Sequence, residues 1–141
     1  MADILVVDDR SKDLEDLKWA AKGAGRTVVP AKNREQALDL ISKNDFDVVV
    51  TDLELIPGDP KSGLDVLNAA KEKDPYTQVI VVTGGGDPEL SVRAMALGAY
   101  DYIQRGALGV NVPAMVRIKI TKALEFRDAV LRSKAMTADQ P

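Results

Sequence analysis

The sequence of 141 residues contains no histidine and no cysteine. Without histidine, the chain has no imidazole base, no Ser-His-Asp triad and no histidine ligand for a metal. Without cysteine, it has no thiol nucleophile, thiolate zinc site, iron–sulfur cluster or disulfide. Any chemistry must therefore use carboxylates, hydroxyls, amines, guanidinium groups, backbone amides or a hard cation with oxygen ligands.

Long apolar runs and an excess of positive charge are also lacking. No apolar run approaches the roughly 18 residues that span a bilayer, and the first residues do not begin a signal peptide. We therefore expect a cytoplasmic protein with no membrane partner. The formal net charge of −3 argues against direct nucleic-acid binding. The charge is uneven, because residues 113–135 sum to +4 and the rest of the chain to −7.

Short apolar runs alternate with longer amphipathic segments along the chain. The runs predict strands at residues 4–7, 27–29 (ended by Pro30), 48–50, 79–82 and 100–103. The segments between them predict helices that begin near Ser11 as a cap, Asn33, Leu64, Asp87 and Pro113, the last ending near Ser133. Strict alternation with uninterrupted apolar strands predicts an α/β fold, a parallel sheet covered by helices on both faces.

One segment leaves an alternative open. Residues 116–121 alternate between apolar and polar side chains like a half-buried strand. The flanking residues, through 123–124 and 129–131, follow helical spacing instead. Helix is the favoured interpretation, and strand is the alternative.

Polar side chains follow four of the predicted strands at the point where each strand ends. Because the carboxyl ends of parallel strands meet at one edge of a sheet, these side chains should gather there. Three carboxylates at one edge repel each other unless a cation neutralises them, and Mg²⁺ is the oxygen-liganded cation that fits best. The polar residues that follow these four strands are Asp8, Asp9, Asp52, Glu54, Thr83 and Arg105.

The same edge should also carry donors for an anion. Thr83 has a hydroxyl, the run 84–86 is all glycine and frees backbone amides, and Arg105 has a guanidinium group. A carboxylate beside Mg²⁺, with such donors around it, can act as a nucleophile toward phosphorus.

Four motifs in order along the chain resemble the receiver domain of two-component response regulators, over roughly residues 3–125. They are ILVVDD at 4–9, VVVTD at 48–52, VVTG at 81–84 and GAYDYI at 98–103. The resemblance implies a flavodoxin-like, doubly wound five-stranded parallel sheet of order 2-1-3-4-5 with five helices, the last one extended. It also implies a receiver domain at 1–125, followed at 126–141 by an extension of the last helix and a polar tail.

The receiver resemblance implies a role for each residue at the predicted edge. Asp52 would be the phosphoacceptor. Asp9 and Asp52 would hold Mg²⁺ with their side chains, and Glu54 with its backbone carbonyl. Asp8 would support them, by holding a metal-bound water or by orienting the site. Thr83 and Arg105 would contact the phosphoryl group, and Tyr102 would be the switch residue whose rotamer follows Thr83. Glu54 and Gly85 would influence the lifetime of the phosphoryl group. Taken alone, Thr83, Tyr102 and Arg105 fit structural roles as well.

The implied function is a signalling switch rather than an enzyme, with self-phosphorylation and self-dephosphorylation as its only reactions. A sensor histidine kinase would donate the phosphoryl group. Phosphorylation would change partner binding through the face of the fourth helix, fifth strand and fifth helix. Residues 98–103 and 123–127 look most like receivers of NtrC-type activators, in which the last helix leads into an effector domain. The output partner is unknown from the sequence, and the chain could be a stand-alone receiver or part of a longer regulator.

Three departures from the family pattern motivate an alternative function. Arg105 stands where the family has lysine, Gly106 where it has proline, and residues 56–63 make a longer loop than usual. The alternative is a receiver-like interaction module that acts without phosphorylation. A third class, an aspartate-based phosphohydrolase with Glu54 as the second acid, would place its nucleophile after the first strand and would need a cap domain.

The last predicted helix carries two apolar sets on different sides. One set is Val116, Ile120, Ala123 and Val130, and the other is Met115, Ile118, Phe126 and Ala129. A helix that is apolar on more than one side needs a second partner. We therefore expect a homodimer through this helix or contact with a following domain.

Overall fold

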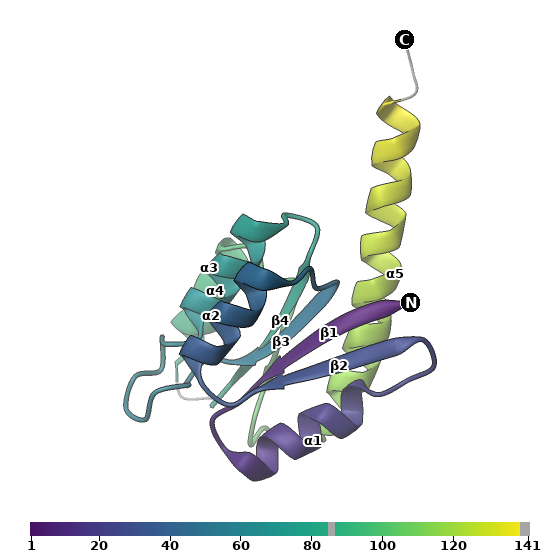
Figure 1. Cartoon of the computed structure of the whole chain (residues 1–141). Helices are drawn as coiled ribbons and strands as arrows, with labels where there is room; N and C mark the ends of the chain where they lie inside the picture. The colour runs from purple at the N-terminus through teal and green to yellow at the C-terminus, as the bar shows by residue number, and fades with distance from the viewer. Residues whose placement is uncertain (85–86, 139–141) are drawn as a thin grey trace.

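A computed structural model describes residues 1–84 and 87–138 of the chain (Figure 1). The strands are β1 (Ala2–Val7), β2 (Arg26–Ala31), β3 (Val48–Asp52), β4 (Gln78–Thr83) and β5 (Asp101–Gln104). The helices are α1 (Ser11–Ala21), α2 (Arg34–Lys43), α3 (Leu64–Lys73), α4 (Pro88–Ala96) and α5 (Val112–Ala138). All strand pairs are parallel and the sheet order is β2-β1-β3-β4-β5, which confirms the predicted doubly wound fold.

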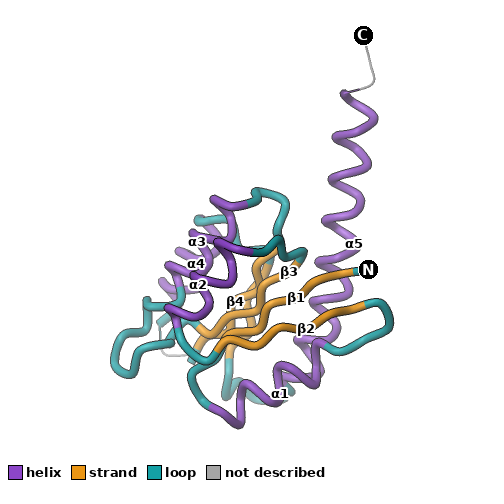
Figure 2. Tube along the Cα trace, viewed as in Figure 1, coloured by secondary structure: helices purple, strands orange, loops and turns teal. Residues whose placement is uncertain are grey.

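The sheet is covered on both faces. Figure 2 shows α2, α3 and α4 on one side of the sheet and α1 and α5 on the other. Successive β1 residues alternate between the two cores, with Leu5 and Val7 facing the first layer and Ile4 and Val6 the second. All four are fully buried. The inner strands β1, β3 and β4 therefore contain uninterrupted apolar runs, because helices shield both of their faces from water.

Two local expectations are wrong. Ser11 does not cap α1; Arg10 occupies the cap position without a side-chain hydrogen bond, and its N–H donates to Asp8 Oδ1 at 3.0 Å. β2 does not stop before Pro30 but runs through it, in register with Val6 of β1. Proline is tolerated there because β2 is an edge strand and needs hydrogen bonds on one side only.

The segment 116–121 is helical, as the favoured interpretation predicted. Val116 and Ile120 are fully buried, whereas Ile118 between them is 50% exposed, so the strand-like alternation reflects one buried stripe of a helix. The helix continues past the predicted end at Ser133 to Ala138, and Figure 1 shows it projecting beyond the sheet. Because α5 is continuous across residue 125, the backbone does not mark the predicted domain boundary there, which stays a prediction.

Contacts with neighbouring loops hold the distal half of α5. Arg127 Nη1 lies 2.9 Å from Asp47 Oδ1, and its Nη2 lies 3.7 Å from Asp74 Oδ2. Further along, Lys134 Nζ lies 4.7 Å from the ring centroid of Tyr76. In the part of the chain that the structure describes, neither α5 nor another helix is long and apolar enough to cross a membrane.

Candidate metal centre

Three acidic side chains converge where β1 and β3 end side by side. Asp8 and Asp9 follow β1, Asp52 is the last residue of β3, and Val7 is in register with Thr51. One carboxylate oxygen from each of the three acids lies within 4.8 Å of the other two. Asp8 is fully buried and Asp52 is 7% exposed. The predicted acidic edge is therefore assembled by the fold.

Burial makes ionisation of Asp8 and Asp52 unfavourable. The pKa of Asp8 is raised to about 6, mainly by burial and also by the charge of Asp52, while the Arg10 N–H and the Arg105 guanidinium oppose the rise. Burial likewise raises the pKa of Asp52, although a 2.9 Å hydrogen bond from the Glu54 N–H to Asp52 Oδ1 opposes the shift. A cation in the cluster would favour the ionised forms.

The donor set suits a hard cation. Oδ1 of Asp9 is buried and has no hydrogen-bond partner among the described residues. Buried carboxylate oxygens normally have partners, and an acceptor without one beside two other carboxylates suits a cation with oxygen ligands. The residues present therefore fit Mg²⁺.

Arg105, which follows β5, reaches into the same cluster. Its Nη2 lies 2.7 Å from Asp8 Oδ2, and its Nε lies 3.8 Å from Asp52 Oδ2. Its Nη1 lies 3.7 Å from Asp13 Oδ1, in the first turn of α1. Sequence reasoning anticipated Arg105 but missed Asp13, although Asp13 lies four residues after Asp9 in the first turn of the predicted helix, and that position could have flagged it.

The backbone around Arg105 differs from what a proline would allow. The Arg105 N–H donates to the Thr83 carbonyl at 2.8 Å, which ties the end of β5 to the end of β4. Gly106 has a φ of +74°, which the pyrrolidine ring of proline excludes. No cis peptide bond occurs among the described residues. The glycine at this position is therefore matched to the local backbone.

A pocket of about 370 Å³ between α4 and β5 is lined by Thr83 and Tyr102, together with Val92 and Met95. Thr83 is buried at the end of β4, whereas Tyr102 is 41% exposed. The structure thus brings the two predicted switch residues to the same cavity. Gly85 lies outside the described residues.

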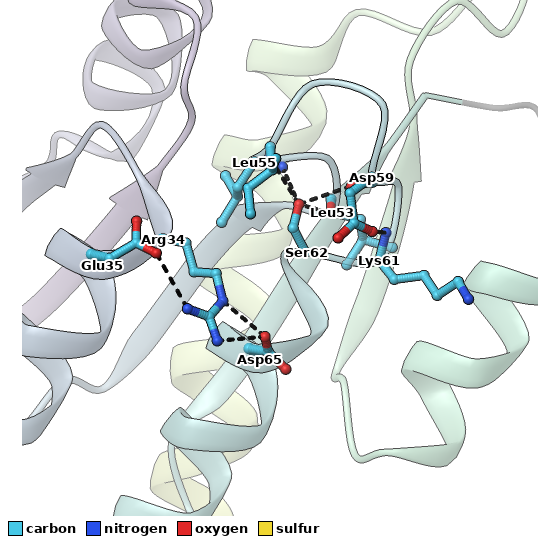
Figure 3. Close-up of polar contacts among 9 residues, drawn as sticks. Arg34, Glu35, Leu53, Leu55, Asp59, Lys61, Ser62 and Asp65 are labelled. Atoms are coloured by element: carbon cyan, nitrogen blue, oxygen red, sulfur yellow. Dashed lines mark hydrogen bonds and ion pairs between the residues drawn. The ribbon is translucent and has the colours of Figure 1, made fainter.

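The loop between β3 and α3 is organised by a buried serine (Figure 3). Ser62 Oγ accepts hydrogen bonds from the N–H groups of Leu55 and Ile56, at 2.8 and 2.9 Å, and donates to the Asp59 carbonyl at 2.9 Å. Sequence reasoning noted the long loop but missed Ser62, because nothing in the sequence distinguishes a buried loop serine from an exposed one.

The neighbours of Ser62 connect this loop to Asp52. A Cβ atom on Gly63 would lie 2.1 Å from the Asp52 carbonyl oxygen, so a side chain there would displace the end of β3. The carboxylate of Glu54 accepts a 3.1 Å hydrogen bond from the Gly58 N–H, so its side chain is held by the loop.

An ion pair joins the helix that follows this loop to α2. At the start of α3, Asp65 pairs with Arg34 of α2 at 2.7 Å (Figure 3).

A model of the response regulator receiver domain family matches residues 4–117. The chain belongs to this family. Receiver domains of two-component systems are signalling domains, generally not enzymes, and they bind Mg²⁺ at their acidic pocket. The predicted family is thereby confirmed.

Three similar proteins illustrate the kind of receiver that this domain resembles. The alginate biosynthesis transcriptional regulatory protein AlgB of Pseudomonas aeruginosa is 32% identical over 94% of this chain and 28% of its own length. The crystal structure of NtrX from Brucella abortus in complex with ATP has a TM-score of 0.82 at 27% identity, over 96% of this chain and 29% of that one. The beryllofluoride-activated NtrC4 receiver domain dimer has a TM-score of 0.75 at 28% identity, over 90% of this chain and 99% of that one.

These matches confirm the predicted similarity to receivers of NtrC-type regulators. This receiver chain spans less than a third of the length of the curated relatives it matches.

Proposed function

We propose that this receiver domain is a phosphoryl-accepting switch and that Asp52 is the acceptor. The observation that carries the proposal is the position of its carboxylate, within 4.8 Å of Asp8 and Asp9 at the open edge of the sheet. A carboxylate oxygen attacks phosphorus and an O–P bond forms. With a phosphohistidine donor the P–N bond breaks, and its electron pair leaves on the imidazole nitrogen of a sensor histidine kinase.

Asp9 and Asp52 would hold Mg²⁺ through their side chains, and Glu54 through its backbone carbonyl, with Asp8 in support through a metal-bound water or by orienting the site. When bound, the ion supplies positive charge where a phosphoryl group meets three carboxylates. The chain contributes positioning of its own. The Glu54 N–H holds one oxygen of Asp52 at 2.9 Å and fixes the direction of the carboxylate.

The phosphoryl oxygens would then be bound by the Thr83 hydroxyl and the Arg105 guanidinium. Movement of Thr83 toward Asp52 would free space for the Tyr102 ring in the cavity that both residues line. That rotation would change the face made by α4, β5 and α5, where Val92 is 70% and Met95 41% exposed. A receiver needs such a two-state element to transmit the modification.

The output would be an effector domain or a second copy of the chain bound through α5. The NtrC4 receiver, which is similar over 90% of this chain, is described as a dimer. On α5, Ile118 and Phe126 are each about half exposed, so apolar surface is available for such a partner.

Intact-mass spectrometry after incubation with acetyl phosphate and Mg²⁺ tests the proposal. We expect a mass increase of one phosphoryl group in the wild type and none in Asp52→Asn, a nearly isosteric change. An equal increase in both proteins would show that Asp52 is not the acceptor.

One observation favours a second candidate, an interaction module that acts without phosphorylation. Arg105 already pairs with Asp8 at 2.7 Å and supplies a cation to the cluster from within the chain. If no phosphoryl adduct forms and Mg²⁺ does not bind, this second function is favoured.

A further inference from the structure

We propose that Asp13 is a positioning residue that shares Arg105 with the acidic cluster and thereby sets how tightly the cluster binds Mg²⁺. The inference rests on the proposed metal site. It assigns a role to a residue of α1 that lies outside the cluster itself.

The geometry of Arg105 carries the first step. Its guanidinium lies among three carboxylates from three segments, with Nη2 at 2.7 Å from Asp8, Nη1 at 3.7 Å from Asp13 and Nε at 3.8 Å from Asp52. A guanidinium presents its donors as a planar fork and can face two acceptors at once, whereas a lysine ammonium is a point charge. The arginine at this position therefore links the cluster to α1.

The second step concerns charge. A divalent cation among Asp8, Asp9 and Asp52 would repel a guanidinium that lies 2.7 Å from an Asp8 oxygen. Arg105 must therefore turn away from Asp8 when the ion binds. Its Nε is buried and makes no hydrogen bond within the described residues, so the present position leaves one donor of the guanidinium without an acceptor.

The third step identifies where the guanidinium goes. Asp13 is already its neighbour, its side chain is 23% exposed, and among the described residues it has no ion-pair partner other than Arg105. By taking over the guanidinium, Asp13 lowers the cost of releasing Asp8 to the metal. It also keeps Arg105 near Asp52, where the phosphoryl group would form.

Isothermal titration with Mg²⁺ tests this role in the full chain, using wild type, Asp13→Asn, Arg105→Gln and the double variant. Asp16→Asn is the matched control, because it removes the same charge from α1 at a residue that faces Lys12, 3.8 Å away. We expect Asp13→Asn to weaken Mg²⁺ binding about fivefold or more and Arg105→Gln to strengthen it. In the Arg105→Gln background, Asp13→Asn should change the affinity no more than Asp16→Asn does.

Two results would overturn the inference while the proposed function stands. One is an Asp13→Asn affinity equal to that of Asp16→Asn. The other is the same loss with and without Arg105, which would indicate a general charge effect. If the wild type binds no Mg²⁺, the proposed metal site is wrong and the role of Asp13 falls with it. Circular dichroism confirms that each variant is folded.

Discussion

Within the site, Asp8 is a carboxylate with no exposed surface. Its partners are the Arg10 N–H and the Arg105 guanidinium, and burial still raises its pKa from 3.8 to about 6. The folded state therefore binds the Asp8 proton more tightly than the unfolded state does. The stabilisation from this proton is complete below about pH 4 and is lost as the pH rises through 6.

The substitution Asp8→Asn tests whether the stability contribution of Asp8 falls as the pH rises. Without Mg²⁺ at pH 7, the free energy of unfolding of the variant should exceed that of wild type by up to about 3 kcal/mol. The loss of the Arg105–Asp8 ion pair in the variant reduces this difference. The difference between the two proteins should grow from pH 4 to pH 7 in urea unfolding with EDTA. Asp45→Asn, at an exposed position, is the control. A difference that shrinks as the pH rises would contradict the assignment.

At the scale of elements, the loop between β3 and α3 joins the end of β3 to the start of a helix. Its conformation depends on one hydroxyl, because Ser62 serves two backbone N–H groups and one carbonyl. The loop also engages the Glu54 carboxylate through Gly58. A substitution at Ser62 should therefore alter the conformation of the backbone beside Asp52.

Ser62→Ala leaves two N–H donors without their acceptor, the Leu55 N–H in a buried hydrogen bond and the Ile56 N–H in a partly buried one. We expect a loss of about 2 kcal/mol in the free energy of unfolding and faster proteolytic cleavage within residues 56–61. The matched control is Ser42→Ala, whose exposed hydroxyl donates to Asp39 and should change stability by less than about 0.5 kcal/mol. Equal effects of the two substitutions would contradict the role of Ser62.

At the scale of the whole molecule, the sheet connects the acidic edge to the proposed partner surface. β4 and β5 carry Thr83 and Tyr102 to one cavity, and α5 packs Val116 and Ile120 against the same sheet. The opposite side of α5 keeps Ile118 half exposed. The proposed signal from Asp52 would therefore reach a partner of α5 without unfolding the core.

Ile118→Glu tests whether a second copy binds through α5. With acetyl phosphate and Mg²⁺, we expect wild type to dimerise and the variant to remain monomeric in light scattering, because a charge at a buried apolar contact is unfavourable. Ile56→Glu is the matched control, since Ile56 is 45% exposed and lies in the β3–α3 loop. A variant that dimerises as the wild type does would show that Ile118 lies outside the contact.

The order of elements and the identity of the acidic residues could be predicted from the sequence alone. Apolar runs such as 48–50 and 79–82 mark strands buried on both faces, and the residues that end parallel strands must share an edge. Helix boundaries were less predictable. Ser11 failed as a cap because the Arg10 N–H is bound by the Asp8 carboxylate, and α5 runs on to Ala138 with Arg127 anchored to two loops.

Only the tertiary structure decided how deeply the charged groups of the site are buried and which partners they have. The burial of Asp8, the reach of Arg105 to Asp13 and the hydrogen bonds of Ser62 depend on which surfaces meet after folding. Periodicity records which side of an element is apolar, because that property repeats along the chain. It does not record the distance between a guanidinium after β5 and a carboxylate on α1, because that distance is set by packing across the whole sheet.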